Sequence, residues 1–321
     1  MSITFLMCSE RSGSNLITKM INAHPEMCGP STKHIINPVV RNAFRYGDLK
    51  ENWEQLVVDI NHLINVNFSF WETSFTYESL MSLAPNGDLS TLLERIFMEE
   101  AKAHHKSHVF VKENQLYEVM SFLLIHFPNA KYLYQVRDPR DMALSWKNSQ
   151  IHKGNVVKAA RQWKKDQVQF LKDFSFLQGK ALLIKYEDLI SQTEETLIKV
   201  CNFFNMPYHE EMNNFYQDKL TTLNANNNEA WSNLSVGVMK DNREKYKAEL
   251  TSTEIKCIEK ICYPEMKVLQ YELTHNLNEL EEFSLEGFEH TLEDKYDSSS
   301  NNAGVNQNKE AKKVFYEKII K

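Results

Sequence analysis

The sequence lacks the features that would place it in a membrane, in an oxidising compartment or on nucleic acid. No apolar run approaches the roughly 20 residues that a transmembrane helix needs, and residues 1–10 contain no basic segment followed by an apolar core and a cleavage site. Five scattered cysteines form no CxxC pair and indicate reduced, mostly buried thiols. A formal net charge of −6 argues against general nucleic-acid binding. We therefore expect a cytoplasmic protein without a membrane span.

Clusters of metal ligands are missing as well. His104, His105 and His108 stand close together without a cysteine companion, a pattern more typical of the end of a surface helix than of a zinc site. The chain has 321 residues, of which 42% are hydrophobic and 25% charged, as in ordinary globular proteins. This length suffices for one large α/β domain or two small ones with a sizeable core.

The stretch from Ser2 to Asn15 predicts an anion-binding loop. Strand-forming residues end at Cys8, a loop with one glycine and several hydroxyl side chains follows, and apolar residues then recur at helical spacing from Leu16. This order directs backbone N–H groups and the positive end of a helix toward an anion. The GxxxxGK[ST] loop, whose hydroxyl holds magnesium, is absent. The loop predicts a nucleotide bound without metal, although by itself it is also compatible with a simple turn.

Strands alternate with helices along the chain. Strand-forming runs are followed by segments with helical periodicity; after the first strand the strands are expected within residues 108–114, 131–137 and 181–189, and helices at 16–26, 117–130, 141–150, 155–174 and 196–204. This alternation predicts an α/β, P-loop-like three-layer fold with a central parallel sheet flanked by helices. Ligands of such sheets bind beyond the carboxyl ends of the strands.

Other segments carry weaker signals. An amphipathic helix at 49–68 opens an expected helical insertion over about 49–106, with a turn at residues 86–88. Ser31 or Thr32 is predicted to cap the next helix, and residues 191–194 have the form of a capping box. We expect an Asn-rich loop over 224–233 and helices ending near Leu273. Residues 274–321 form an acidic tail, in which we expect no order over 297–309 and a helix in the final KEAKKVFYEKIIK.

The most specific string is VRDPRDMALS, residues 136–145. Arg137 at the end of a strand and Ser145 in the following helix can both reach one phosphate, the guanidinium by charge and the hydroxyl by a hydrogen bond. Pro139 fixes the start of the helix. By itself the string fits a strand-to-helix turn with a surface ion pair equally well.

Taken together, SERSGSN, VRDPRDMALS and KYEDL resemble, in order and spacing, the sulfotransferase superfamily, whose members use 3′-phosphoadenosine 5′-phosphosulfate (PAPS). The resemblance covers roughly residues 3–273. It implies that the 5′-phosphosulfate is bound by Arg11, Ser12, Gly13, Ser14 and Asn15. It also implies that Arg137 and Ser145 bind the 3′-phosphate, and that Lys112 contacts the bridging or sulfuryl oxygens. KYEDL is assigned to structural support.

The sequence departs from the family pattern at two places. Many members that act on carbohydrates or tyrosine have a glutamate base where residues 30–32 read Pro-Ser-Thr. His34 matches a histidine in a bacterial branch that includes domains associated with polyketide chain termination, and it is the candidate base; the alternative is a packed histidine. The loop that covers the nucleotide lacks its Arg-Lys-Gly run, which leaves Lys240 and Arg243 as candidates and Trp231 as a stacking partner.

The resemblance implies transfer of a sulfuryl group from PAPS to an acceptor hydroxyl without a metal, with His34, Lys112 and Arg11 at the reacting groups and 3′,5′-bisphosphoadenosine as product. The aromatic-rich insertion over 49–106 is expected to cover the acceptor site of a 1–273 domain. A small metabolite, a sugar, a lipid and a carrier-bound acyl chain remain open as acceptors, and the sequence does not determine the oligomeric state. An atypical P-loop kinase using ATP and a non-catalytic nucleotide- or carrier-binding module are the alternatives.

Overall fold

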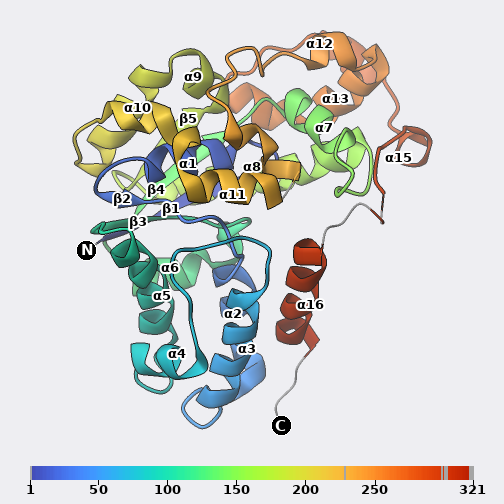
Figure 1. The fold of residues 1–321 in the computed structure, drawn as a ribbon. Helices are drawn as coiled ribbons and strands as arrows, with labels where there is room; N and C mark the ends of the chain where they lie inside the picture. Colours follow the sequence, from blue (N-terminus) through green and yellow to red (C-terminus); the bar gives the residue numbers. More distant parts are fainter. Residues whose placement is uncertain (1, 228, 298, 300–302, 318–321) are drawn as a thin grey trace.

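The computed structural model describes residues 2–227, 229–297, 299 and 303–317. A five-stranded parallel sheet in the order β2-β3-β1-β4-β5 forms its middle layer (Figure 1). The strands are β1 (Ser2–Cys8), β2 (Met27–Cys28), β3 (His108–Lys112), β4 (Lys131–Val136) and β5 (Ala181–Lys185). This confirms the predicted fold class. Strand β2 was not predicted, because two residues are too few to show a strand pattern of their own.

Alternate residues of β1 enter two separate cores, as the two-residue period of a strand requires. Phe5 and Met7 pack on the face covered by α6 (Met120–His126) and α8 (Val156–Phe176). Leu6 and Cys8 pack on the other face, against α1 (Ser14–Asn22) and α10 (Thr193–Phe204). All four side chains are buried, and each such burial contributes roughly 1.5–3 kcal/mol. The sheet is therefore held between two helical layers.

The expected helical insertion contains α3 (Trp53–Asn65), α4 (Tyr77–Leu83) and α5 (Leu89–Ala103), which lie below the sheet in Figure 1. The apolar stripe of α3, including Trp53 and Leu56, is buried as its spacing predicts. The predicted turn at 86–88 places Asp88 before α5, where its side chain accepts a hydrogen bond from the N–H of Thr91 (3.0 Å).

The remaining elements complete the two helical layers and the C-terminal region. They are α2 (Ile36–Asn42), α7 (Pro139–Lys147), α9 (Tyr186–Ser191), α11 (Lys219–Asn227), α12 (Tyr246–Glu249), α13 (Ser252–Val268), α14 (Leu277–Glu282), α15 (Phe288–Thr291) and α16 (Ala303–Glu317), with 3₁₀ helices η1 (Ala43–Tyr46), η2 (Leu116–Val119), η3 (Glu210–Gln217) and η4 (Glu229–Ser235).

Both predicted helix caps are wrong, because neither helix begins at the residue that the motif places there. Helix α2 begins only at Ile36, and Thr32 Oγ1 donates to the carbonyl of Lys112 (2.8 Å). Helix α10 has no side-chain cap, and Ser191 Oγ donates to the carbonyl of Glu187 inside α9 (2.6 Å). In each case the hydroxyl donates to a carbonyl oxygen and accepts no hydrogen bond from an N–H group of the helix that it was expected to cap.

The Asn-rich segment is also not the predicted loop, since α11 and η4 occupy most of it; Asn228 lies outside the described residues. Asn224 is fully buried and pairs with the backbone of Phe70, accepting from its N–H (2.8 Å) and donating to its carbonyl (3.0 Å). This paired contact lets a buried asparagine sit in a helix, where its intrinsic propensity is low.

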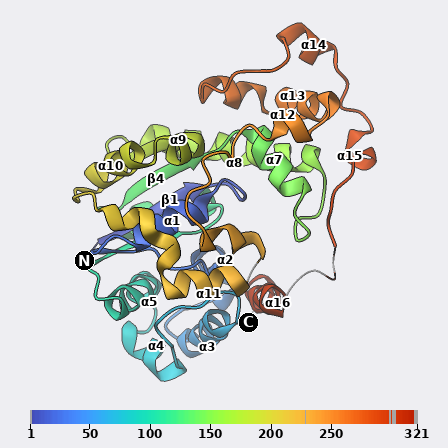
Figure 2. The ribbon, with the colours of Figure 1, turned by 45° about the horizontal axis from the view of Figure 1, so that its top comes forward.

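The C-terminal region ends in a helix, as predicted, but the helix starts earlier. Helix α16 begins at Ala303, so the expectation of no order over 297–309 is wrong from that residue on. Residues 298, 300–302 and 318–321 lie outside the described part of the chain. Figure 2 shows α16 beside α3 and α2, and residues of α16 contact both helices.

Candidate active site

The loop between β1 and α1 forms a tight corner at the carboxyl edge of the sheet. Gly13 precedes α1 with a φ of 80°, in the left-handed region that favours glycine. A Cβ at Gly13 would lie 2.3 Å from the ring of Tyr186, so the close approach also requires glycine. The first turn of α1 contains no acidic residue. Its N–H groups and its helix dipole therefore favour a negatively charged ligand.

Arg137, at the end of β4, joins three segments around this loop. Its Nη1 donates to the carbonyl of Arg11 (3.1 Å) and its Nη2 to the carbonyl of Asn242 (3.3 Å). The guanidinium lies over the ring of Tyr186, 4.5 Å from the centroid. Arg11 Nε donates to Ser145 Oγ (3.0 Å). The two arginines and the serine that the sequence assigned to two phosphates therefore line one cavity.

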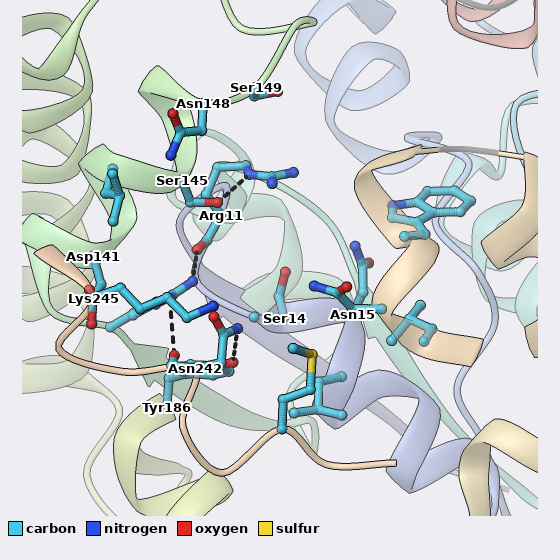
Figure 3. Close-up of a pocket in the computed structure, with 18 of the residues that line it drawn as sticks. Arg11, Ser14, Asn15, Asp141, Ser145, Asn148, Ser149, Tyr186, Asn242 and Lys245 are labelled. Carbon is cyan, nitrogen blue, oxygen red and sulfur yellow. Dashed lines mark hydrogen bonds between the residues drawn. The ribbon is translucent and has the colours of Figure 1, made fainter. Parts of the chain in front are cut away.

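These groups line a cavity of about 340 Å³ (Figure 3). Part of the lining is apolar, supplied by Leu16, Trp231, Leu234, Val238 and Met239. Polar donors around an aromatic wall suit an anionic ligand that carries a planar ring. The Arg137 Nε is buried without a hydrogen-bond partner among the described residues. An unsatisfied buried donor at this position fits an anionic oxygen, which would complete its hydrogen bonding.

An acidic residue in the lining holds the covering segment in place. Asp141 accepts hydrogen bonds from the N–H groups of Glu244 (2.6 Å) and Tyr246 (3.1 Å), and burial raises its pKa. Asn242 Nδ2 from the same segment donates to Tyr186 Oη (2.8 Å). These contacts fasten the segment over the cavity and do not leave a free carboxylate to repel an anion.

The structure brings most, but not all, of the predicted cofactor-binding residues together. Gly13, Ser14 and Asn15 line the cavity. Ser12 does not, because its side chain is buried and its Oγ donates to the carbonyl of Ser9 (2.6 Å). The side chain of Ser12 therefore stabilises the loop from inside, and its role in cofactor binding stays a prediction.

Lys240 lies apart from the predicted phosphate ligands. It borders a shallow hollow beside the start of α10, together with Thr193. Lys245, five residues further along, lines the main cavity instead. The segment over the cavity thus supplies a lysine, but not the one that the sequence favoured.

His34 lies in the chain between β2 and α2, where it meets a carboxylate. His34 has a φ of 56°, a left-handed conformation that is unusual for a residue with a Cβ. Its Nδ1 lies 3.2 Å from Oε1 of Glu113, the residue that follows β3. The other carboxylate oxygen, Oε2, accepts the N–H groups of Ile35 (3.1 Å) and Ile36 (3.2 Å) at the start of α2. Glu113 therefore caps α2 and orients the histidine at once.

This pairing assigns the protons of the histidine. A carboxylate that already accepts two N–H groups prefers a donor at Oε1, so neutral His34 holds its proton on Nδ1 and leaves Nε2 as an acceptor. Burial lowers the pKa of His34, and the ammonium groups of Lys312 and Lys112 act in the same direction. Burial raises the pKa of Glu113 to about 7. The pair can therefore act as a base near neutral pH.

Rings connect His34 to the cavity wall. The imidazole lies 5.4 Å from the ring of Phe68, and Phe68 lies 5.4 Å from the indole of Trp231, which lines the cavity. Lys112, the last residue of β3, pairs in register with Leu6 of β1 and precedes Glu113 directly. The predicted base, the predicted lysine and the anion-binding loop therefore follow adjacent strands of one sheet edge.

Glu113 is the residue that the sequence pattern did not assign. Residues 30–32 contain no acid, and the structure places the carboxylate of Glu113, from the end of another strand, beside His34. The available signal was an acidic residue directly after the apolar run HVFVK, at the carboxyl end of a predicted strand. Nothing in the local pattern, however, connects residue 113 with residue 34.

The parallel sheet, flanked by helices and carrying a cavity beyond the carboxyl ends of its strands, defines the chain as an α/β protein. The model of the sulfotransferase family matches residues 4–210, and the chain belongs to that family. Over 113 residues it is 30% identical to carbohydrate sulfotransferase 2 of Mus musculus and of Homo sapiens, a match that covers 34% of this chain and 20% of each relative. The match thus spans only a fifth of these curated relatives.

Solved structures show the same fold. The sulfotransferase domain from the curacin biosynthetic pathway aligns with a TM-score of 0.55 at 20% identity, covering 85% of this chain and 98% of that domain. The sulfotransferase domain of the Synechococcus PCC 7002 olefin synthase aligns with a TM-score of 0.59 at 17% identity. This alignment covers 85% of this chain and 96% of that domain.

The described residues contain neither a candidate membrane span nor a candidate metal cluster. No helix there is both long and apolar enough to cross a membrane. No group of three or more His, Cys, Asp or Glu side chains in the same part of the chain is placed to hold a metal ion.

Proposed function

We propose that this sulfotransferase-family protein takes its sulfuryl group from PAPS and transfers it to an acceptor hydroxyl, with His34 as the general base. The observation that carries the proposal is the cavity in which the N-terminus of α1, Arg11, Arg137 and Ser145 meet beside an aromatic wall. A 3′-phosphorylated adenine nucleotide with a 5′-phosphosulfate has two separate anionic groups and one ring, which this arrangement can accommodate.

Each group of the chain has a role in this proposal. The α1 N-terminus with Arg11, Ser14 and Asn15 would hold the 5′-phosphosulfate, Arg137 with Ser145 the 3′-phosphate, and Trp231 the adenine. The donor supplies an activated sulfuryl group, so that the new O–S bond forms as the bridging S–O bond breaks and 3′,5′-bisphosphoadenosine leaves.

His34 Nε2 would accept the hydroxyl proton while Nδ1 remains bonded to Glu113. Lys112 and the loop N–H groups would stabilise the charge that grows on the departing phosphate. Phe68, between the His34 ring and Trp231, would separate the acceptor side from the nucleotide side. The α3–α5 insertion would border the acceptor within a domain of residues 1–273.

Two measurements test the proposal. Calorimetric titration should give micromolar binding of 3′,5′-bisphosphoadenosine and little binding of ATP with magnesium, whereas preference for ATP would favour a kinase. Turnover of ³⁵S-labelled PAPS should then be followed against panels of hydroxyl acceptors: small metabolites, sugars, lipids and carrier-bound acyl chains. Tight bisphosphate binding without transfer to any acceptor would favour a non-catalytic binding module.

The His34→Ala variant tests the base. It should lower turnover at least about a hundredfold, the lower end of general-base contributions, while bisphosphate affinity stays unchanged, because His34 does not line the cavity. His290→Ala on α15 is a suitable control, since this side chain is exposed and does not line the cavity. Near-normal turnover by a folded His34→Ala protein would remove His34 from the mechanism.

A further inference from the structure

The C-terminal helix α16 returns to the loop that carries His34. Phe315 and Ala311 are buried, and the ring of Phe315 lies 6.3 Å from that of Tyr46. Gly304 approaches the insertion so closely that a Cβ would lie 2.0 Å from the carbonyl oxygen of Asn67. Figures 1 and 2 both place α16 beside α2 and α3, and residues of α16 contact both helices. The helix therefore packs against the proposed domain of residues 1–273 and is not a free tail.

One contact ties α16 to the backbone next to the base. The buried side chain of Asn308 donates from Nδ2 to the carbonyl of Lys33 (3.2 Å), and His34 is the next residue. Lys312 follows Asn308 by four residues, so both side chains lie on one face of the helix. Asn308 thus anchors α16 to the backbone beside His34, and Lys312 lies on the anchored face of the helix.

The charge of Lys312 reaches the catalytic pair. Its side chain is half-buried, and no described carboxylate lies within the 4.0 Å of an ion pair with it. The charged groups that face it are Glu113, Glu10, Lys309 and Lys112. Its neighbour Lys313 is exposed and pairs with Glu310 on the same helix (2.6 Å). Of these two adjacent lysines, only Lys312 therefore acts on the His34–Glu113 pair.

We propose that α16 is part of the catalytic site and that Lys312 is a positioning residue, whose charge keeps the His34–Glu113 pair in its base form. This inference rests on the proposed function of His34. A cation near the pair favours ionised Glu113 and disfavours protonated His34. Both effects act in the same direction, and Lys112 adds to them from the end of β3. The C-terminal region would then be required for activity near neutral pH.

The test compares Lys312→Gln with Lys312→Arg and with the control Lys313→Gln. For Lys312→Gln, the acidic limb of the kcat/KM profile should move to higher pH by on the order of half a unit, because one nearby positive charge is lost. Lys312→Arg should restore the wild-type profile, and Lys313→Gln should not change it. An unchanged profile for Lys312→Gln overturns the proposal. A rise of kcat/KM at all pH values also overturns it, since it would identify α16 as an obstruction of the acceptor path.

A second readout does not depend on turnover. The pKa of His34 can be followed from its imidazole NMR signals in the protein without ligands, assigned by comparison with His34→Gln. Lys312→Gln should raise this pKa and Lys313→Gln should leave it unchanged. If wild-type protein transfers no sulfuryl group but the His34 pKa still rises in Lys312→Gln, the proposed function fails and the coupling stands. If transfer occurs and the pKa does not move, the coupling fails alone.

Undocking the helix provides an independent variant. Phe315→Ala removes a buried ring and should shift the acidic limb in the same direction as Lys312→Gln, whereas Tyr316→Ala removes a partly exposed ring and should shift it less. Faster amide hydrogen exchange of α16 in Phe315→Ala would show that the helix has undocked. If the pH profile of kcat/KM then equals that of the wild type, docking of α16 does not affect the base.

Discussion

Replacing Glu113 with glutamine should disable His34 without removing it. In the native pair Oε2 accepts the N–H groups of Ile35 and Ile36, and Oε1 faces His34 Nδ1. A glutamine has one acceptor oxygen and one NH₂ group. The two backbone donors require the oxygen, so the NH₂ group is left to face the imidazole. His34 Nδ1 must then accept a hydrogen bond, which moves the ring proton to Nε2 and abolishes the base.

The magnitude follows from this tautomer argument. If Nε2 carries the proton, Glu113→Gln should lose as much turnover as His34→Ala, about a hundredfold or more, or about 2.7 kcal/mol of transition-state stabilisation. Because the glutamine oxygen still accepts the N–H groups of α2, the unfolding free energy should fall by only about 1–2 kcal/mol, the difference between a charged and a neutral acceptor. Glu113 is 2% exposed, so solvent cannot replace it.

The assay is turnover of labelled donor at saturating acceptor, with calorimetry of 3′,5′-bisphosphoadenosine on the same preparations. Glu118→Gln is the control, because Glu118 bonds to Asn37 and Arg41 on the same helix but not to His34. Bisphosphate affinity should be unchanged in both variants. Turnover of Glu113→Gln within threefold of wild type, in a folded protein, would refute the assigned tautomer and the role of the pair.

Three further predictions concern pH, the cofactor arginine and the loop glycine. Activity should fall as pH decreases through about 7, because Glu113 has a pKa of about 7 and the pair gains a proton below it; a profile flat from pH 6 to 8 contradicts this. Arg137→Ala should weaken bisphosphate binding tenfold or more through loss of a charged donor, whereas Arg161→Ala, on the exposed face of α8, should not; equal affinities would refute the 3′-phosphate assignment. Gly13→Ala should cost at least about 2 kcal/mol of unfolding free energy from backbone strain and the clash with Tyr186. Gly179→Ala, with a similar φ but no atom within 4 Å, should cost about 1 kcal/mol; equal costs would show that the clash is absorbed.

Local patterns were enough to predict the frame of this protein. Strands β1, β3, β4 and β5 and the helices that follow them are encoded by periodicity within short windows, because side-chain alternation and backbone propensity act over a few residues. The order of strands and helices then implies parallel pairing and a ligand site at the carboxyl edge. Because the carboxyl ends of parallel strands lie at one edge of the sheet, the glycine loop after β1 and the 136–145 string after β4 were expected to meet at the cavity.

Only the tertiary structure decided which side chains serve the site. Ser12 turns inward, Lys240 lies at another hollow, and the carboxylate beside His34 comes from Glu113, 79 residues away. The segment expected to be unordered begins a helix that places Lys312 near the same pair. These outcomes depend on contacts between segments that are distant in sequence. Local propensity carries no information about such contacts, because their free energy arises only when the sheet has brought the segments together.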